Sequence, residues 1–240
     1  MAPHLALDVV VDPAIFQRWP GYRAGIVHAA QVRNEPSDDH SRRLLAAAQR
    51  CRARLGERPI TADAHIAAWR DAYRDFGAKP SRYRSSAEAL ARRALGAGLP
   101  AVNAVVDLYN AVSVAHLIPV GGEDLAGVRG AVHLRPAGAG EPFETREDGG
   151  PAVVGVDAGE VVWADEAGVT CRRWNWRQCT RTELTVGTTA AYFVFDALPP
   201  CDDDALTAAI GELVAGLRER SPGAVIDTMV LRAGAPAHSA

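Results

Sequence analysis

The chain has 240 residues, enough for one large domain or two small ones with a sizeable core. A net charge of −3 and a hydrophobic fraction of 48% exclude a uniformly basic nucleic-acid coat and an acidic tail. The charge is uneven, because residues 1–100 contain 16 Lys and Arg against 10 Asp and Glu, whereas residues 101–240 contain 10 against 19. A basic N-terminal part hints at a polyanionic partner, although solvated helix faces explain the same balance more simply.

Several classes of protein lack support in this sequence. No apolar run approaches the ~18 residues that span a bilayer, and the N-terminus has no basic region and meets Asp8 early, unlike a secretory signal. The four cysteines (Cys51, Cys171, Cys179 and Cys201) have no metal-ligand spacing. P-loop, GxGxxG, HExxH and GxSxG motifs are missing from the sequence. We therefore expect a cytoplasmic protein with reduced thiols and with neither metal nor cofactor.

Hydrophobic periodicity and capping residues predict the elements of the first hundred residues. In chain order they are a strand over Leu5–Val11, a short helical piece in DPAIFQRWPG, a strand over Tyr22–Val32, and helices from Ser37 to about Leu55, from Thr61 to Gly77 and over Ala87–Leu95. Residues 37–98 are thus predicted to form a block of three consecutive helices.

After residue 100 the pattern changes. It predicts a helix over Val102–His116, the glycine-rich loop PVGGEDLAG, short β-like runs (VRGAVHLR, PAVVGVD, EVVWAD, VTCRRW and AAYFVFDAL), a helix over Asp202–Arg218 and a strand over Val225–Leu231. We expect an α+β fold with a largely antiparallel sheet, an N-terminal helical block and a C-terminal helix. The expected organisation is a single domain over residues 1–240, with a helical subdomain over 37–98 and a mainly β portion over 101–232 that carries the site.

The stretch KPSRYRSSAEAL places two arginines beside a predicted helix start. Arg82 and Arg84 flank Tyr83, and serines open the helix that follows. Free N–H groups at a helix start favour an anion, so Arg82 and Arg84 are candidate RNA contacts. A capped helix with solvated arginines is the plainer explanation.

The predicted helix 102–116 carries polar groups on one face. Asn103, Asp107 and Asn110 are three and four residues apart, so they either find buried partners or line a pocket. His116 ends the helix beside the loop that contains Gly121 and Gly122, where the backbone can approach a ligand closely. A histidine there could act as a general acid or base, although such a residue more often compensates the helix dipole.

The segment CRRWNWRQCTRT concentrates tryptophans and arginines. If it continues a strand, alternation places Arg173, Asn175 and Arg177 on one face and two tryptophans on the other. Together with Arg181 and Thr182, these groups could hold a carboxylate, a phosphate or a ribose. Cys179 lies between two arginines and could be a nucleophile, but a buried, inert thiol is commoner.

These stretches together resemble the B3/B4 domain family, a tRNA-associated domain that occurs inside the beta subunit of bacterial phenylalanyl-tRNA synthetase and also as free-standing proteins. The resemblance covers about residues 15–200, on WPGYRAGIV, RYRSSAEALARRALGAGLPAVNAVVDLYNAVS, PVGGEDLAGVRG and CRRWNWRQCTRT…YFVFDAL. It implies an amino-acid-sized pocket and hydrolysis of an aminoacyl ester, with His116 falling where the synthetase domain has a pocket histidine. The synthetase pocket also has a glutamate in a Gly-Gly-Glu turn, whereas the corresponding residues here, Arg177–Arg181, include no carboxylate. Specificity for tyrosine therefore does not carry over.

Three functions follow from these observations. The favoured hypothesis is a free-standing editing protein that binds tRNA or its aminoacyl end, in contact with a synthetase or alone, and hydrolyses a mischarged ester. Its predicted catalytic residues are His116 and Arg177, and its predicted substrate contacts are Asn110, Gly121, Gly122, Asn175, Arg181 and Thr182. The alternatives are a non-catalytic RNA-binding module, suggested by Arg42, Arg43, Arg50, Arg52 and Arg54, and a binder or hydrolase of a free amino acid or small aminoacyl compound.

Overall fold

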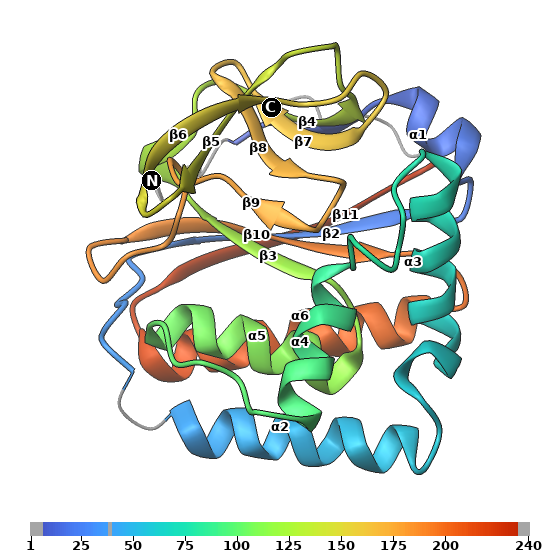
Figure 1. The fold of residues 1–240 in the computed structure, drawn as a ribbon. Helices are drawn as coiled ribbons and strands as arrows, with labels where there is room; N and C mark the ends of the chain where they lie inside the picture. Colours follow the sequence, from blue (N-terminus) through green and yellow to red (C-terminus); the bar gives the residue numbers. More distant parts are fainter. Residues whose placement is uncertain (1–6, 38–39, 235–240) are drawn as a thin grey trace.

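The protein consists of two packed β-layers above two layers of helices (Figure 1). This computed structural model describes residues 7–37 and 40–234. A four-stranded antiparallel sheet forms the middle layer in the order β11-β2-β10-β3. The bounds of its strands are Arg23–Ala30 for β2, Val120–Asp124 for β3, Ala190–Ala197 for β10 and Val225–Arg232 for β11. Strand β3 is an edge of this sheet, and its residues contribute to the site described below.

The upper β-layer is a five-stranded sheet in the order β1-β4-β7-β8-β9, with a separate hairpin beside it (Figure 1). Its strands are β1 (Val9–Val11), β4 (Val132–Pro136), β7 (Val161–Asp165), β8 (Gly168–Arg172) and β9 (Arg177–Gln178), and the hairpin is β5 (Pro142–Glu147) with β6 (Gly150–Gly155). The pair β1 and β4 is parallel, and the other pairs of this sheet are antiparallel.

The helices cover the lower face of the middle sheet and one end of the sandwich. They are α1 (Pro13–Arg18), α2 (His40–Leu55), α3 (Ala64–Asp75), α4 (Ser86–Leu95), α5 (Ala104–His116) and α6 (Asp203–Arg220), with short 3₁₀ turns η1 (Ile60–Ala62) and η2 (Leu125–Gly127). Side chains cap the starts of α3, α5 and α6, where Asp63, Asn103 and Asp202 accept backbone N–H groups. Helices α5 and α6 lie directly under the sheet and α2 lies below them (Figure 1).

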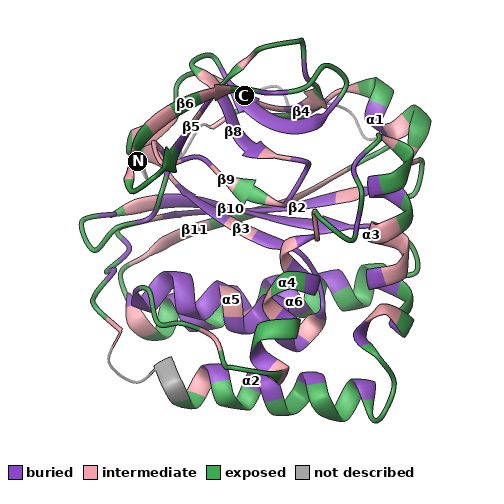
Figure 2. Ribbon diagram, in the orientation of Figure 1, coloured by how far each residue is buried: buried purple, intermediate pink, exposed green. Residues whose placement is uncertain are grey.

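Strand β10 separates the two main cores because its side chains alternate between faces. Phe193 and Phe195 pack downward with residues of α5 and α6, whereas Tyr192 and Val194 pack upward against the other sheet. The strand is buried along almost its whole length (Figure 2). Asp196 falls on the upward face, so an acidic group is placed in the apolar space between the sheets.

The structure confirms the α+β fold, the three consecutive helices of the early block, the C-terminal helix and the last strand. Residues 5 and 6 of the first predicted strand, and the predicted cap at Asp38, lie outside the described residues. The glycine-rich segment after α5, predicted as a loop, is instead strand β3 with the turn η2. Within the described part of the chain, none of the helices combines the length and the apolar character that crossing a membrane requires.

Candidate functional site

A cavity of about 220 Å³ lies beside the edge strand β3, between the two sheets and helices α4 and α5. It is walled by segments that are far apart in the sequence. Its lining residues are Ser86, Ala89 and Leu90 from α4; Tyr109 and Asn110 from α5; Val120, Gly121 and Glu123 from β3; Trp163 and Cys171 from the upper sheet; Trp174–Gln178 from the turn after β8 and from β9; and Val194 and Asp196 from β10. Four predicted site residues meet here, namely Asn110, Gly121, Asn175 and Arg177.

The turn after β8 does not continue the strand, so the predicted alternation of residues 172–177 is wrong. Arg173 and Trp174 have positive φ angles of 45° and 67°, which reverse the chain after Arg172. The cause is the packing of Trp174, which is fully buried, with ring centroids 4.7 Å from Trp19 and 5.1 Å from Trp69. Burying this large ring compensates for the strained backbone and directs the next residues into the cavity.

Asn175 ties the turn to three other elements. The Tyr73 hydroxyl donates to its side-chain oxygen at 3.0 Å, and its amide donates to Asp196 at 3.1 Å. Its backbone carbonyl accepts the N–H of Ser86 at 3.0 Å. Since Ser86 is the first residue of α4, this bond fixes the helix start against the turn. Asn175 therefore holds the cavity wall in place as well as lining it.

Cations and rings alternate in a cluster that begins at Trp176 and Arg177 of the cavity wall and continues to Tyr83, Arg173 and Arg82, and this cluster is called the mouth of the cavity below. The Arg173 guanidinium lies 3.8 Å from the centre of the Tyr83 ring and 4.9 Å from that of Trp176. The exposed Arg177 lies over the same Trp176 ring at 4.6 Å, and the exposed Arg82 lies over Tyr83 at 5.2 Å. Arg173 also pairs with Asp157 and Glu160, so the positive charge of this partly aromatic mouth comes from Arg82 and Arg177.

Two buried carboxyl groups line the cavity and were not predicted from the sequence. Asp196 accepts hydrogen bonds from the Tyr22 hydroxyl at 2.6 Å and from Asn175, one on each oxygen. Burial raises the pKa of Asp196 to about 7, although these donors and the nearby indole N–H groups of Trp163 and Trp174 oppose the shift. Neither indole N–H makes a hydrogen bond of normal geometry within the described structure.

Glu123 is the second carboxyl, and its surroundings differ. Burial raises its pKa to about 7, while hydroxyl groups of Tyr192, Thr182 and Thr170 lie near enough to oppose the shift. Its Oε2 atom is buried and makes no hydrogen bond of normal geometry within the described structure. The side chain is only 4% exposed. The cavity thus contains a buried carboxyl group that has neutral hydroxyl neighbours and no cationic partner among the described residues.

The prediction that His116 faces the same cavity as Asn175 and Arg177 is wrong. Its Nε2 lies 2.7 Å from Glu212 on α6 and 3.3 Å from Arg50 on α2, between the helical layers. Six residues separate His116 from Asn110, which turns the side chain by about 240° around the helix axis. Asn110 therefore reaches the cavity and His116 faces away from it.

Three more predicted substrate contacts lie outside the cavity lining. Arg181 forms a bidentate ion pair with Asp165, both bonds at 2.8 Å, and Thr182 is fully buried behind the wall. Gly122 turns its missing side chain towards α5, because a Cβ there would lie 3.1 Å from Tyr109. These residues support the site instead of lining it. Cys179 is also fully buried and burial raises the pKa of its thiol, which favours an inert cysteine over a nucleophile.

The two predicted RNA contacts differ in their surroundings. Arg82 is exposed at the mouth, whereas Arg84 is half-buried, lies 3.8 Å from the Glu88 carboxylate and donates to the Ser81 carbonyl. Of the basic residues of α2, Arg43, Arg50 and Arg54 form ion pairs with Glu219, Glu212 and Asp63 respectively. That helix therefore presents less free positive charge than its sequence suggests. The described residues contain no group of three or more His, Cys, Asp or Glu arranged to hold a metal ion.

The signal for Glu123 was present in the sequence. Side chains two apart on a strand share a face, so Glu123 follows Gly121 into the cavity. Because residues 119–127 were predicted to be a loop, the shared face of Gly121 and Glu123 was not recognised. Asp196 lies in a strand of otherwise apolar residues, AAYFVFDAL, and an acidic group there is a sign of a buried polar function.

Comparison with known proteins places the chain in a family. No curated protein matches it. Among solved structures, an N-terminal fragment of the phenylalanyl-tRNA synthetase beta subunit from Pyrococcus horikoshii is similar over 93% of this chain, with 12% identity and a TM-score of 0.46. The match covers 54% of that fragment, so this chain spans about half its length. The family model of the B3/4 domain matches residues 68–213, which include most of the cavity wall, and the chain therefore belongs to the B3/4 domain family.

Proposed function

We propose that this protein binds the aminoacyl end of a tRNA and hydrolyses a wrongly attached aminoacyl ester. The observation that carries the proposal is the cavity, which gathers Asn110, Gly121, Asn175 and Arg177 around about 220 Å³. This volume is below the ~300 Å³ at which pockets for drug-sized ligands begin, so it accommodates one amino-acid moiety and leaves a nucleotide outside. The B3/B4 resemblance supports the same class of substrate.

The mouth of the cavity suits the nucleotide that carries the amino acid. Bases of single-stranded RNA stack on aromatic side chains, and their phosphates pair with arginines. Trp176 and Tyr83 supply rings at the mouth, and Arg82 and Arg177 supply exposed guanidinium groups. The terminal nucleotide is therefore placed on the mouth and its amino acid in the cavity.

The reaction needs a positioned water and a stabilised oxyanion. The water oxygen bonds to the ester carbonyl carbon, the bond from that carbon to the ribose oxygen breaks, and the ribose oxygen takes up a proton as the free amino acid leaves. With His116 directed elsewhere, the neighbouring hydroxyl of the terminal ribose is the group that orients the water. Arg177 can stabilise the developing negative charge, because it lines the cavity and is not in an ion pair with any described residue.

The test is deacylation of a panel of charged tRNAs, correctly and incorrectly paired. Release of at least one mispaired amino acid should exceed the spontaneous rate, and Arg177→Ala should reduce it about tenfold or more. Arg50→Ala is the matched control, because that arginine is paired with Glu212 on the helical side. If no charged tRNA is deacylated above background, the hydrolase proposal fails. A mobility shift without release would favour the non-catalytic RNA-binding module, and a response to free amino acids alone would favour the small-molecule binder.

A further inference from the structure

Glu123 is a buried carboxyl group that has no cationic partner among the described residues. Its Oε2 atom has no hydrogen bond of normal geometry within the described structure, and its side chain is 4% exposed. A buried carboxylate oxygen without a donor costs free energy, and proteins rarely keep one without a function. Glu123 is one of the residues that line the cavity, so its side chain borders a ligand bound there.

The neighbours of Glu123 leave its charge uncompensated. Hydroxyl groups of Tyr192, Thr170 and Thr182 surround it, and no described residue forms an ion pair with it. The hydroxyls of Tyr192 and Thr170 are buried and make no hydrogen bond of normal geometry within the described structure, but they lie close enough to Glu123 to lower its pKa. A buried carboxyl group surrounded by neutral hydroxyl groups and without a cation is complementary to a ligand that brings a positive charge.

Asp196 does not compete for that role. Each of its two oxygens already accepts a hydrogen bond, from Tyr22 and from Asn175. Along β10 it lies four residues from Tyr192, the register partner of Glu123, so the backbone positions of the two acidic residues are about 13 Å apart along the strand. Asp196 anchors the turn, whereas only neutral hydroxyl groups lie beside Glu123.

The position of Glu123 fits the geometry of an aminoacyl ester. It lines the same cavity as Arg177, which stabilises the ester carbonyl oxygen in the proposed reaction. The α-amino group is attached to the carbon next to that carbonyl. A carbonyl oxygen held at Arg177 therefore leaves the α-ammonium group in the cavity that Glu123 lines.

We infer that Glu123 binds the free α-ammonium group of the substrate, so that the site accepts aminoacyl groups and rejects N-acylated and hydroxyacyl groups of the same shape. The inference rests on the proposed function for the identity of the ligand. The substrate class that it predicts is defined by a free α-ammonium group and does not depend on the amino-acid side chain. The aromatic wall, which includes Trp163, Trp174 and Tyr109, then contacts the side chain itself.

The experiment measures binding without hydrolysis. Amides of phenylalanine, tyrosine, leucine and methionine replace the ester, and each is compared with the 2-hydroxy amide of the same shape, in which a hydroxyl stands in place of the ammonium group. By calorimetry at pH 7 and concentrations up to 10 mM, at least one amino-acid amide should bind about tenfold or more tightly than its hydroxy counterpart. In Glu123→Gln, which keeps the shape and removes the charge, the ratio should fall below about threefold.

Glu183→Gln is the matched control, because it removes an exposed carboxylate that pairs with Arg146 outside the cavity, and it should keep the wild-type ratio. Thermal denaturation checks that each variant folds. Equal binding of amide and hydroxy amide by the wild type, an unchanged ratio in Glu123→Gln, or no binding of any amide would overturn the inference.

The binding experiment and the deacylation assay can refute the two proposals separately. If charged tRNA is deacylated but the amides and hydroxy amides bind alike, the proposed function stands and the role of Glu123 is wrong. If the amides are selected but no charged tRNA is deacylated, Glu123 binds an ammonium group in a site that does not hydrolyse the ester.

Discussion

A buried glutamate is paired with arginines in the helical layers, whereas a buried glutamate in the space between the sheets has no cationic partner among the described residues. Glu88 on α4 is fully buried, and its carboxylate accepts hydrogen bonds from Arg70 at 2.9 and 3.1 Å and from Arg92 at 3.0 Å. Glu123 on β3 is almost as buried, but no described cation pairs with it. The first arrangement is what a stable fold requires of a buried charge, whereas the second leaves a polar group for a ligand.

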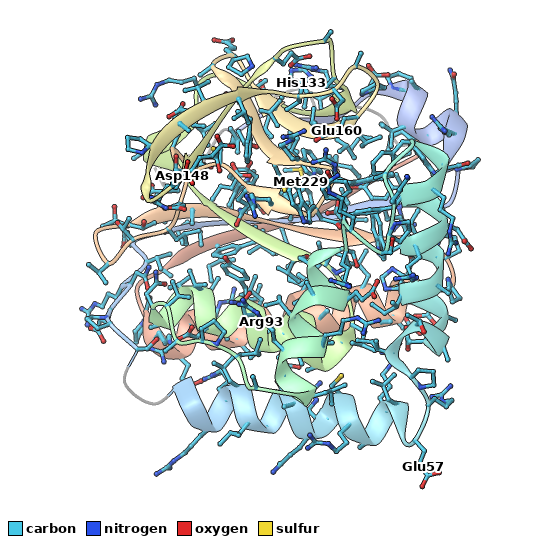
Figure 3. The ribbon with its side chains drawn as sticks, in the orientation of Figure 1. Glu57, Arg93, His133, Asp148, Glu160 and Met229 are labelled. Atoms are coloured by element: carbon cyan, nitrogen blue, oxygen red, sulfur yellow. The ribbon has the colours of Figure 1, made fainter. Side chains whose placement is uncertain are left out.

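The upper layer of strands contains a third buried glutamate that follows the first pattern. Glu160, labelled in Figure 3, accepts hydrogen bonds from Arg172 at 3.0 and 2.9 Å, and Arg173 lies 3.4 Å away. These contacts hold the start of the tryptophan-containing turn against the sheet. Glu88 and Glu160 are thus paired and lie outside the cavity lining, whereas Glu123, which lines the cavity, has no cationic partner among the described residues.

The largest expected effect comes from breaking the paired glutamate. Glu88→Ala leaves Arg70, whose side chain is 21% exposed, without its partner, and we expect it to lower the free energy of unfolding by about 3 kcal/mol. Urea denaturation at pH 7 measures the change. Glu219→Ala, which removes a 70%-exposed partner of Arg43, should cost less than about 1 kcal/mol. Equal losses in the two variants would show that Glu88 has no special structural role.

Glu123 should lower the free energy of unfolding when it is ionised, whereas Glu88 raises it, so the effect of Glu123 depends on pH. Burial raises the pKa of Glu123 to about 7, above the ordinary value of 4.5, so its contribution is fully present below pH 4.5 and is lost as the pH rises through 7. The groups that face it are Tyr192 on β10, Tyr109 on α5, Cys171 on β8 and Asp165 on β7, together with Thr170 and Thr182. None of them carries a positive charge that would cancel the effect.

Glu123→Gln should therefore be more stable than the wild type at pH 8 by about 2 kcal/mol and similar to it at pH 5. Urea denaturation at the two pH values measures this difference. The other buried carboxyl, Asp196, is present in both proteins, so the comparison isolates Glu123. A variant that is destabilised equally at both pH values would mean that Glu123 makes a structural contact and is not a free acceptor.

Much of the fold followed from local signals, because capping residues and apolar periodicity act within a few residues. Asp63, Asn103 and Asp202 mark the helix starts that the structure shows. The residues of the site were predicted from the sequence only in part. Asn110, Gly121, Asn175 and Arg177 were found because they are polar residues beside turns or apolar runs.

The errors arise where packing over long distances decides the direction of a side chain. His116 faces α2 and α6 because of helix rotation, and the sequence offers no sign of its partner Glu212, which is 96 residues away. The turn at Arg173 and Trp174 depends on the rings of Trp19 after α1, Trp69 in α3 and Phe76 after α3, which no strand pattern predicts. Glu123 was missed because β3 was taken for a loop.

A smaller effect is expected at the mouth of the cavity. Arg82→Ala should weaken binding of tRNA several-fold at low salt and reduce the salt dependence by about one unit of slope, because one phosphate contact is lost. Filter binding between 50 and 200 mM salt measures both quantities. Arg43→Ala is the control, since Glu219 neutralises that arginine on the helical side. If Arg43→Ala weakens binding as much as Arg82→Ala does, RNA lies along α2 and not across the mouth.

The smallest effect is expected for His116→Gln, which tests the contrast between helical layers and cavity directly. The histidine pairs with Glu212 at 2.7 Å on a partly exposed face, so its loss should change the free energy of unfolding by less than about 1 kcal/mol. Deacylation by the proposed site should stay within about twofold of the wild type, since His116 does not reach the cavity and Arg177 does. The rates of His116→Gln and Arg177→Ala are measured side by side on the same charged tRNA. A loss at His116 as large as the loss at Arg177 would place the reacting ester at the end of α5, outside the cavity, and would remove the argument for Glu123 together with it.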